Sequence, residues 1–187
     1  QPSLQGAVRI SNLAFAEESS WLEEGLLPNV LQPLFEALSI RPEELPAAAL
    51  ASFFPDKELD SKDDVVRSVL KILVHALNVH LAASIAMAAA PGGHMSIYFD
   101  ALDHFKHLAM KYHPPQLSAV TDDDFAKYHF VVEAAYRLHD LFLGTYLEFQ
   151  PEASIFLISD HGFRSGEERW TALPNHAGAP ALEHQFY

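Results

Sequence analysis

Two short apolar runs separated by helical sequence restrict the fold of this chain more than any other feature. Residues 95–99 and 154–158 contain β-branched and aromatic side chains and no charge, which is typical of buried strands. Between them, residues 100–113 and 122–149 carry apolar side chains at helical spacing. A strand, a helical crossover and a second strand predict a parallel sheet that is covered by helices.

Helix-breaking and helix-capping residues define the ends of this crossover. Pro114-Pro115 cannot continue the helix that follows the first strand, so we expect that helix to end near His113. Thr121, with Asp124 three residues later, predicts the start of the second long helix. The sequence after Gly166 is typical of a loop.

A Pro-Gly-Gly sequence at residues 91–93 divides the chain into two parts, which we expect to form a single domain over residues 1–187. The first part, residues 1–90, is typical of a helical region and contains no recognisable catalytic constellation. His75 and His80 are isolated there, and such histidines lie more often on a polar helix face or in a core than at a metal ion. We therefore expect the chemistry in the second part, residues 91–187.

The longest apolar stretch, residues 69–90, is long enough to raise the question of a membrane span. A span needs about 20 mostly apolar residues, and Lys71 and three further polar side chains interrupt this one. We therefore expect a buried amphipathic helix over residues 65–90, no transmembrane segment and no targeting signal within the sequence given. The predicted solvent-exposed stripe of this helix comprises Asp64, Arg67, Lys71, His75 and Asn78.

Composition excludes several classes of function. The chain has 12 Lys and Arg against 25 Asp and Glu, and its net charge of −13 argues against a nucleic-acid clamp or an anionic-membrane binder. The absence of cysteine excludes disulfides, thiolate zinc sites and cysteine nucleophiles. Any metal site must therefore use oxygen and nitrogen ligands, for which the 11 histidines and many carboxylates are available.

Aspartate and histidine follow the first predicted strand, at the sheet edge where parallel sheets bind ligands. Asp103 and His107 are four residues apart, so on a helical turn they share one face and can hold one ion. Asp100 and His104 have the same spacing on a different face. Spacing alone does not choose between the two pairs.

Aspartate and histidine also follow the second predicted strand. Asp160 and His161 are adjacent, and Gly162 permits a sharp turn that brings their side chains together. Carboxylate oxygen and imidazole nitrogen suit zinc at about 2.0–2.2 Å, with manganese as the alternative. Either element alone is a weak signal, but the two together, each closing a strand of one crossover, indicate a metal site.

Residues 97–107 (IYFDALDHFKH) and 156–163 (FLISDHGF) resemble the type I phosphodiesterase/nucleotide pyrophosphatase family of the alkaline phosphatase superfamily. Residues 113–115 and 136–143 are similar to its bacterial branch. The resemblance covers residues 91–187, the carboxy-terminal part of the family's catalytic domain. It implies a three-layer α/β/α sandwich with a mostly parallel sheet, here partial and preceded by a helix-rich amino-terminal half.

The resemblance also implies two divalent metal ions, zinc foremost and manganese as the alternative. The family's third ligand at the first ion is a histidine followed four residues later by glycine. His176 has Gly178 at the wrong interval, so His184 is preferred. The implied metal ligands are Asp103, His107 and His184 at one ion, and Asp160 and His161 at the other.

The function implied by the resemblance is hydrolysis of a small phosphate ester by two-metal in-line displacement. Residues 1–90 contain no match to the family's Thr or Ser nucleophile or to its first metal-binding aspartate, so we expect both upstream of this chain. The chain by itself is then expected to be inactive. The alternative is a non-catalytic relative, or a helical interaction module with a vestigial metal site.

Overall fold

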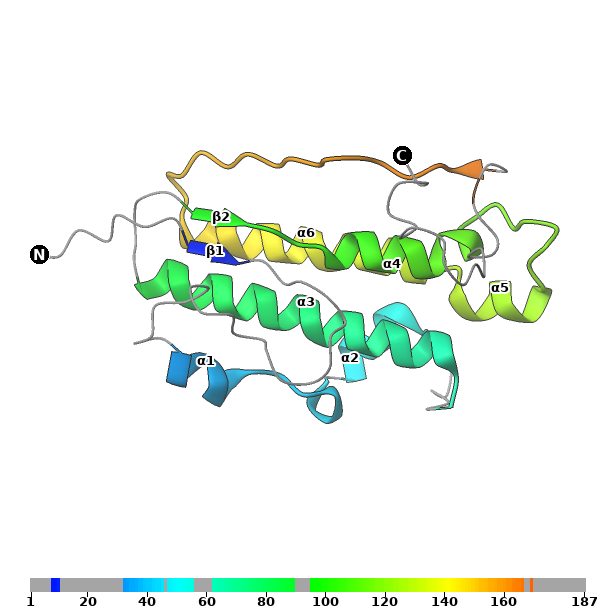
Figure 1. Ribbon diagram of the computed structural model, residues 1–187, viewed down its shortest axis with the longest axis horizontal. Coiled ribbons are helices and arrows are strands. Elements are labelled where there is room, and N and C mark those ends of the chain that lie inside the picture. The colour runs from blue at the N-terminus through cyan, green and yellow to red at the C-terminus, as the bar shows by residue number, and fades with distance from the viewer. Residues whose placement is uncertain are drawn as a thin grey trace, which may run out of the picture.

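The computed structural model describes residues 8–10, 32–45, 47–55, 62–89, 95–166 and 169 (Figure 1). Helices dominate this part of the chain. In chain order they are α1 (Gln32–Leu38), the 3-10 helix η1 (Pro42–Glu44), α2 (Ala47–Phe53), α3 (Asp64–Ala89), α4 (Ala101–Ala109), the 3-10 helix η2 (Met110–Tyr112), α5 (Asp122–Tyr128) and α6 (Val131–Phe149). The two strands are β1 (Val8–Ile10) and β2 (Met95–Ile97).

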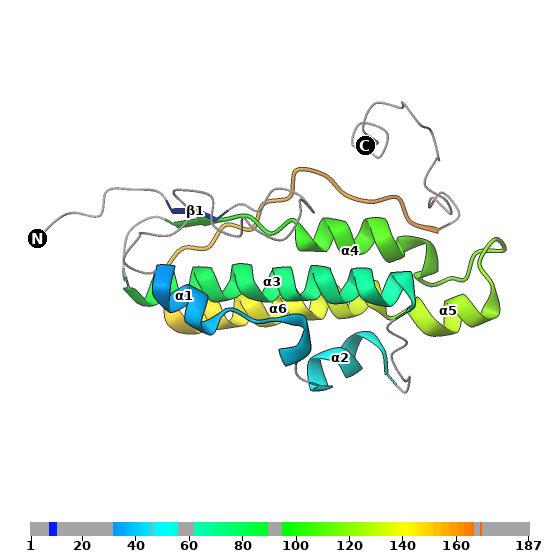
Figure 2. The ribbon, with the colours of Figure 1, turned by 60° about the horizontal axis from the view of Figure 1, so that its bottom comes forward.

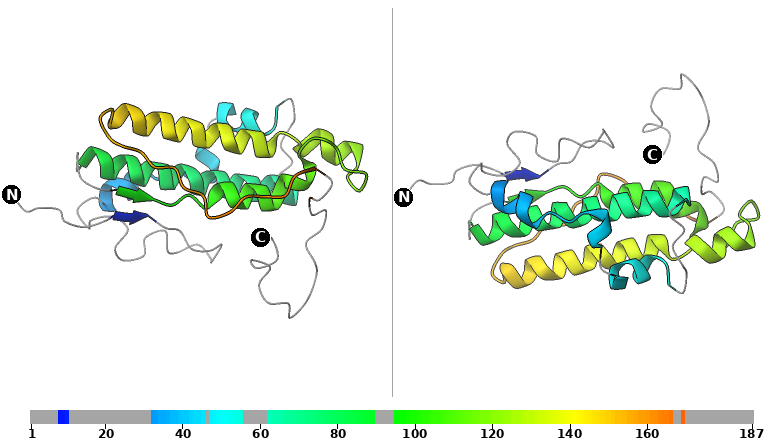
Figure 3. Two further views of the ribbon diagram at one scale, coloured as in Figure 1. Left: turned by 90° about the horizontal axis from the view of Figure 1, so that it is seen from above. Right: turned by 90° about the horizontal axis from the view of Figure 1, so that it is seen from below.

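Three of these helices, α3, α4 and α6, pack against one another and form the body of the protein (Figure 2). Helix α1 packs on α3, and α2 packs on α6. Successive long elements alternate in direction: α3 and α6 run one way, whereas β2 and α4 run the other way (Figure 1). Residues 154–166, which we name the extended segment, run alongside β2 and α4 in the same direction as both (Figures 1 and 3).

Helix α3 confirms the predicted amphipathic helix. Asp63 caps its start, because the backbone N–H groups of Val65 and Val66 donate to Asp63 Oδ1 at 3.0 and 3.1 Å. Among the helices that the structure describes, α3 alone is long and apolar enough to cross a membrane, but most of its apolar window is buried inside the protein, as in a core helix. Its fully buried side chains are Val69, Leu73, Ala76 and Ala83.

The predicted solvent-exposed stripe of α3 is wrong at two of its five positions. Asp64, Arg67 and Lys71 are exposed, whereas Asn78 is only 5% exposed. The amide of Asn78 accepts from Ile40 N at 2.8 Å and donates to Ile40 O at 2.9 Å. His75 is also turned inward, and this side of α3 tolerates both polar side chains because each has a hydrogen-bond partner.

The predicted three-layer α/β/α sandwich is wrong. In the described part of the chain, β1 and β2 form one two-stranded parallel sheet, in which Val8 pairs with Met95 and Ile10 with Ile97. The strand predicted at residues 154–158 is extended but belongs to no ladder, and Leu157 is 85% exposed. A strand needs a hydrogen-bonded neighbour, and here the helices bury one another instead of covering a wide sheet.

The helical part of the predicted crossover is largely confirmed. Helix α4 and η2 fill the region up to His113 and end before the two prolines. Thr121 caps α5, accepting from Asp124 N at 3.1 Å. The single long helix predicted over residues 122–149 is broken into α5 and α6 at residues 129–130.

Candidate metal centre

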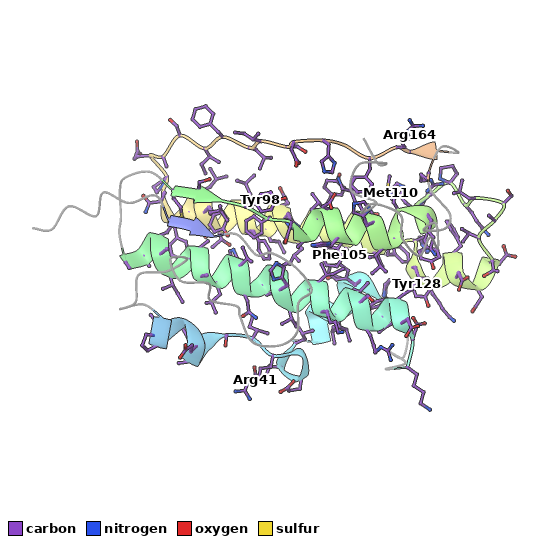
Figure 4. The ribbon with its side chains drawn as sticks, in the orientation of Figure 1. Arg41, Tyr98, Phe105, Met110, Tyr128 and Arg164 are labelled. Carbon is purple, nitrogen blue, oxygen red and sulfur yellow. The ribbon has the colours of Figure 1, made fainter. Side chains whose placement is uncertain are left out.

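Helix α4 holds the first two predicted ligands in place. Asp103 and His107 lie one turn apart on it, with His107 Nε2 3.2 Å from Asp103 Oδ2. The opposite face of α4 is anchored by Phe105, which is fully buried and stacks on Phe53 with the ring centroids 5.1 Å apart. In Figure 4, Phe105 lies between α3 and α4. The carboxylate and the imidazole therefore sit on a rigid element, half-buried at the surface of the helical layer.

The extended segment brings a third predicted ligand to the same place. His161 Nε2 lies 3.7 Å from Asp103 Oδ1, whereas His107 contacts the other carboxylate oxygen. The Ser159 hydroxyl donates to the carbonyl of His161 at 2.6 Å, which closes the local turn. We name Asp103, His107 and His161 the Asp103 cluster. Residues 58 positions apart thus meet at one carboxylate, whereas the resemblance assigns His161, with Asp160, to a second ion.

The Asp103 carboxylate lacks a partner on one oxygen. Oδ1 is buried and makes no hydrogen bond, although His161 faces it. Burial raises the pKa of Asp103, but the hydrogen bond from His107 and the charges of His107 and His161 outweigh it, so the pKa lies below its usual value. The cluster therefore presents an ionised carboxylate with one oxygen turned toward an imidazole and unsatisfied.

Aromatic and basic side chains flank the Asp103 cluster. The ring of Phe163 meets that of His107 edge-on, with the centroids 4.8 Å apart. Lys106 Nζ lies 4.4 Å from the centre of the Phe163 ring and 3.5 Å from the hydroxyl of Tyr136 on α6. The extended segment is thus attached to α4 through Phe163, beside a positive charge. Arg164, the next residue, points away from the helices (Figure 4).

The other predicted ligands are not brought to this cluster. Asp160 is 73% exposed, and its Oδ1 lies 3.8 Å from His161 Nε2, outside the contact with Asp103. His184 and its alternative His176 lie outside the described residues. Within the described residues, no group of three or more His, Asp or Glu side chains is arranged to hold a metal ion as it stands. At Asp103, each carboxylate oxygen faces a different imidazole. The donor atoms therefore do not point at one common position where an ion could bind.

A second carboxylate, at the residue that precedes α4, has similar surroundings, which the sequence did not reveal. Asp100 Oδ1 lies 2.9 Å from His75 Nε2, and Asp100 Oδ2 lies 3.6 Å from His104 Nε2. Burial raises the pKa of Asp100, but the contacts with His104 and His75 outweigh it and hold the pKa well below its usual value. The spacing of Asp100 and His104 was visible in the sequence. The approach of His75 from α3 was not, because it depends on how α3 packs on α4.

No protein-family model, curated protein or solved structure matches this chain. The resemblance to phosphodiesterases therefore rests on the sequence elements given above, and the site is interpreted from its own chemistry.

Proposed function

We propose that this chain supplies part of the metal centre of a hydrolase of small phosphate esters, of the phosphodiesterase type. The observation that carries the proposal is the buried Oδ1 of Asp103, which has no hydrogen-bond partner and faces His161, while His107 contacts the other oxygen. A divalent cation between Asp103 Oδ1 and the His161 imidazole would satisfy that oxygen. The proposal depends on this cluster and not on the predicted sandwich, which the structure lacks.

The donor set fits zinc. One carboxylate and two imidazoles are the ligands of many catalytic zinc sites, which keep a fourth position open for water or substrate. Manganese is the alternative because a carboxylate ligand is compatible with it. Asp160 stands beside His161 on the same turn and is exposed, so it is available to a second ion. The phosphodiesterase resemblance instead implies that Asp160 and His161 together bind that second ion.

The residues around the cluster have roles that follow from their charges. A bound divalent cation supplies positive charge that polarises a phosphoryl oxygen and stabilises the attacking and leaving oxygens. Asp103 supplies the negative charge that holds the cation, and His107 and His161 must be neutral to bind it. Lys106 places an ammonium group beside the cluster, which favours an anionic ester at a protein whose net charge is −13.

The test is turnover of an aryl phosphodiester by the full-length protein after metal removal and addition of Zn²⁺ or Mn²⁺. We expect Asp103→Asn and the double variant Asp160→Asn/His161→Ala each to reduce turnover at least ~100-fold, since even outer-shell partners of a metal cost 10–100-fold. His129→Gln is the matched control. His129 follows the last residue of α5, and its Nδ1 donates to Phe125 O at 2.7 Å, away from the cluster. Full turnover in the Asp103→Asn variant, or none in the metal-loaded wild type, would refute the proposal.

The alternative, a non-catalytic interaction module, is favoured by one observation. Phe156, Leu157 and Ile158 are 83, 85 and 87% exposed, and contiguous exposed apolar side chains are typical of interaction surfaces. Metal analysis of the purified full-length protein separates the two functions. A hydrolase should contain about one or two zinc or manganese ions that Asp103→Asn removes, whereas an interaction module should contain none.

A further inference from the structure

The chain that leads into His161 has little support of its own. Every residue from 151 to 160 is exposed, so this stretch buries little surface against the helices. On the other side of His161, the ring of Phe163 contacts that of His107, with the centroids 4.8 Å apart. The position of His161 beside Asp103 therefore depends on how the chain that follows it is attached.

Arg169, just beyond the extended segment, provides a second attachment. This residue is only 4% exposed, and Nε, Nη1 and Nη2 of its guanidinium group all donate hydrogen bonds. Nε donates to Gly166 O at 2.6 Å, and Nη1 donates to Met110 O at 3.2 Å. Nη1 also donates to the carbonyl of His113, and Nη2 donates to that of Pro115. These four acceptors are all backbone oxygens.

The four carbonyls belong to two separate parts of the chain. Gly166 is the last residue of the extended segment, and its φ of 63° is a left-handed conformation that glycine adopts without steric cost. The other three carbonyls lie within η2 or in the three residues that follow it. A helix end carries partial negative charge on its last carbonyls, so a cation is favourable there. Arg169 therefore joins the end of the extended segment to the end of the helical stretch that carries Asp103.

The shape of the guanidinium group makes this bridge possible. It presents five N–H donors in a planar fork and can therefore reach carbonyls of two chain segments at once, whereas lysine has a single nitrogen. Because Arg169 is buried, its removal would leave carbonyls of both segments without these donors, which is unfavourable. The bridge at Gly166 and the contact of Phe163 together limit how far His161 can move from Asp103.

We propose that Arg169 is a positioning residue of the candidate metal centre: by joining Gly166 to the end of η2, it holds the extended segment, and with it His161, against Asp103. The part of this inference that concerns metal binding rests on the proposed function, whereas the attachment of the segment does not. Loss of the bridge leaves Asp103 and His107 in place on α4 and releases His161. A merely structural role of Arg169 would instead lower the stability of the protein and leave the Asp103 cluster unchanged.

The first test is the contact between the rings of Phe163 and His107, followed in the full-length protein by the nuclear Overhauser effect between their ring protons. Arg169→Met removes the bridge and should abolish this effect, because the segment is then free to leave α4. Arg164→Met is the matched control, since it removes the same charge from a side chain that points away from the helices (Figure 4). The control should retain the effect.

The second test is the affinity of the same variants for Zn²⁺, measured by titration calorimetry. Arg169→Met should weaken binding at least ~10-fold, since loss of a partner outside the ligand shell costs 10–100-fold. Arg164→Met should bind zinc as the wild type does. A wild type that binds no zinc would refute the hydrolase proposal, and the ring contact of Phe163 then decides by itself whether Arg169 holds the segment.

A measurement on the wild type keeps the proposal testable if Arg169→Met fails to fold. The Nε–H proton of Arg169 is buried and donates to Gly166 O, so it should exchange with water at least ~10-fold more slowly than that of free arginine. Exchange as fast as in free arginine would overturn the proposal. So would a folded Arg169→Met variant that keeps the contact between Phe163 and His107, or one that loses this contact and binds zinc with unchanged affinity.

Discussion

The helical layer and the extended segment both contain runs of large apolar side chains, and yet these runs have opposite environments. On α3, which packs against α4 and α6, Val69 and Leu73 are fully buried. In the extended segment, Leu157 and Ile158 are 85 and 87% exposed. The difference shows that apolar composition does not by itself bury a residue; an element of suitable shape must lie opposite it.

The Asp103 cluster connects these two regions. Asp103 and His107 belong to α4, which the helical core holds in place, whereas His161 belongs to the extended segment. The segment is attached to α4 by Phe163, whose ring contacts His107 and Lys106. Half of the candidate site is thus fixed by a packed core and half by a few surface contacts. Experiments that compare the stability of the helical core with that of the extended segment therefore also test how firmly the candidate site is held.

The largest effect is expected at Phe105 in the helical layer. Phe105→Ala removes a fully buried ring that stacks on Phe53, and such truncations destabilise by about 3–5 kcal/mol. Urea unfolding followed by circular dichroism gives the free energy of unfolding. Leu141→Ala on α6 is the control, since Leu141 is 69% exposed, and it should change that free energy by less than about 0.5 kcal/mol. Similar losses in the two variants would contradict the assigned core.

A smaller loss of stability is expected at the start of α3, which is capped by Asp63. Asp63→Ala removes the acceptor for two backbone N–H groups and for the hydroxyl of Tyr128, and should destabilise by about 2 kcal/mol. Asp64→Ala is the matched control, because Asp64 is 86% exposed and its pair with Arg67 is at the surface. The same unfolding experiment measures both. An Asp64 variant less stable than the Asp63 variant would show that the cap is misplaced.

In the interior of the helical layer, the imidazole of His80 should resist protonation. His80 stacks on Phe142 with ring centroids 4.2 Å apart and shares a hydrogen bond of 2.9 Å with the Tyr146 hydroxyl. Burial lowers the pKa of His80 below its usual 6.5. Below that pH the unfolded chain therefore binds a proton that the folded chain rejects.

His80 thus contributes stability above pH 6.5 that is progressively lost as the pH falls toward its pKa in the folded protein. His80→Phe should make the free energy of unfolding less dependent on pH between about 6.5 and 5. Unfolding curves of the wild type and the variant across this range provide the measurement. An unchanged pH dependence in the variant would place His80 in contact with water.

Local patterns in the sequence predicted the helical elements and the ligand pairs within them. The cap at Thr121, the stop before Pro114 and the pairing of Asp103 with His107 need only neighbours in sequence, and the structure confirms each. The approach of His161 to Asp103 was also predicted, although by the edge of a sheet that does not form. The two side chains meet because the extended segment runs beside α4.

The errors concern contacts between distant parts of the chain. An apolar run such as residues 154–158 has the composition of a strand, but its pairing depends on neighbours that the run itself does not specify. His75 and Asn78 follow the polar spacing of α3, yet both are turned inward because Asp100 and Ile40 provide partners. The sequence could not assign the role of these two side chains, because they lie at positions predicted to be exposed and are instead turned toward partners inside the protein.

The smallest effect is expected in the extended segment itself. Leu157→Thr replaces an apolar side chain that is 85% exposed and should change the free energy of unfolding by no more than about 0.5 kcal/mol. Leu73→Ala in α3, also a loss of leucine but from a fully buried position, should cost about 2–5 kcal/mol. Urea unfolding of both variants measures the contrast directly. A loss of 2 kcal/mol or more at Leu157 would mean that the segment is packed in the folded protein, and His161 would then be held by a core as firmly as Asp103 is.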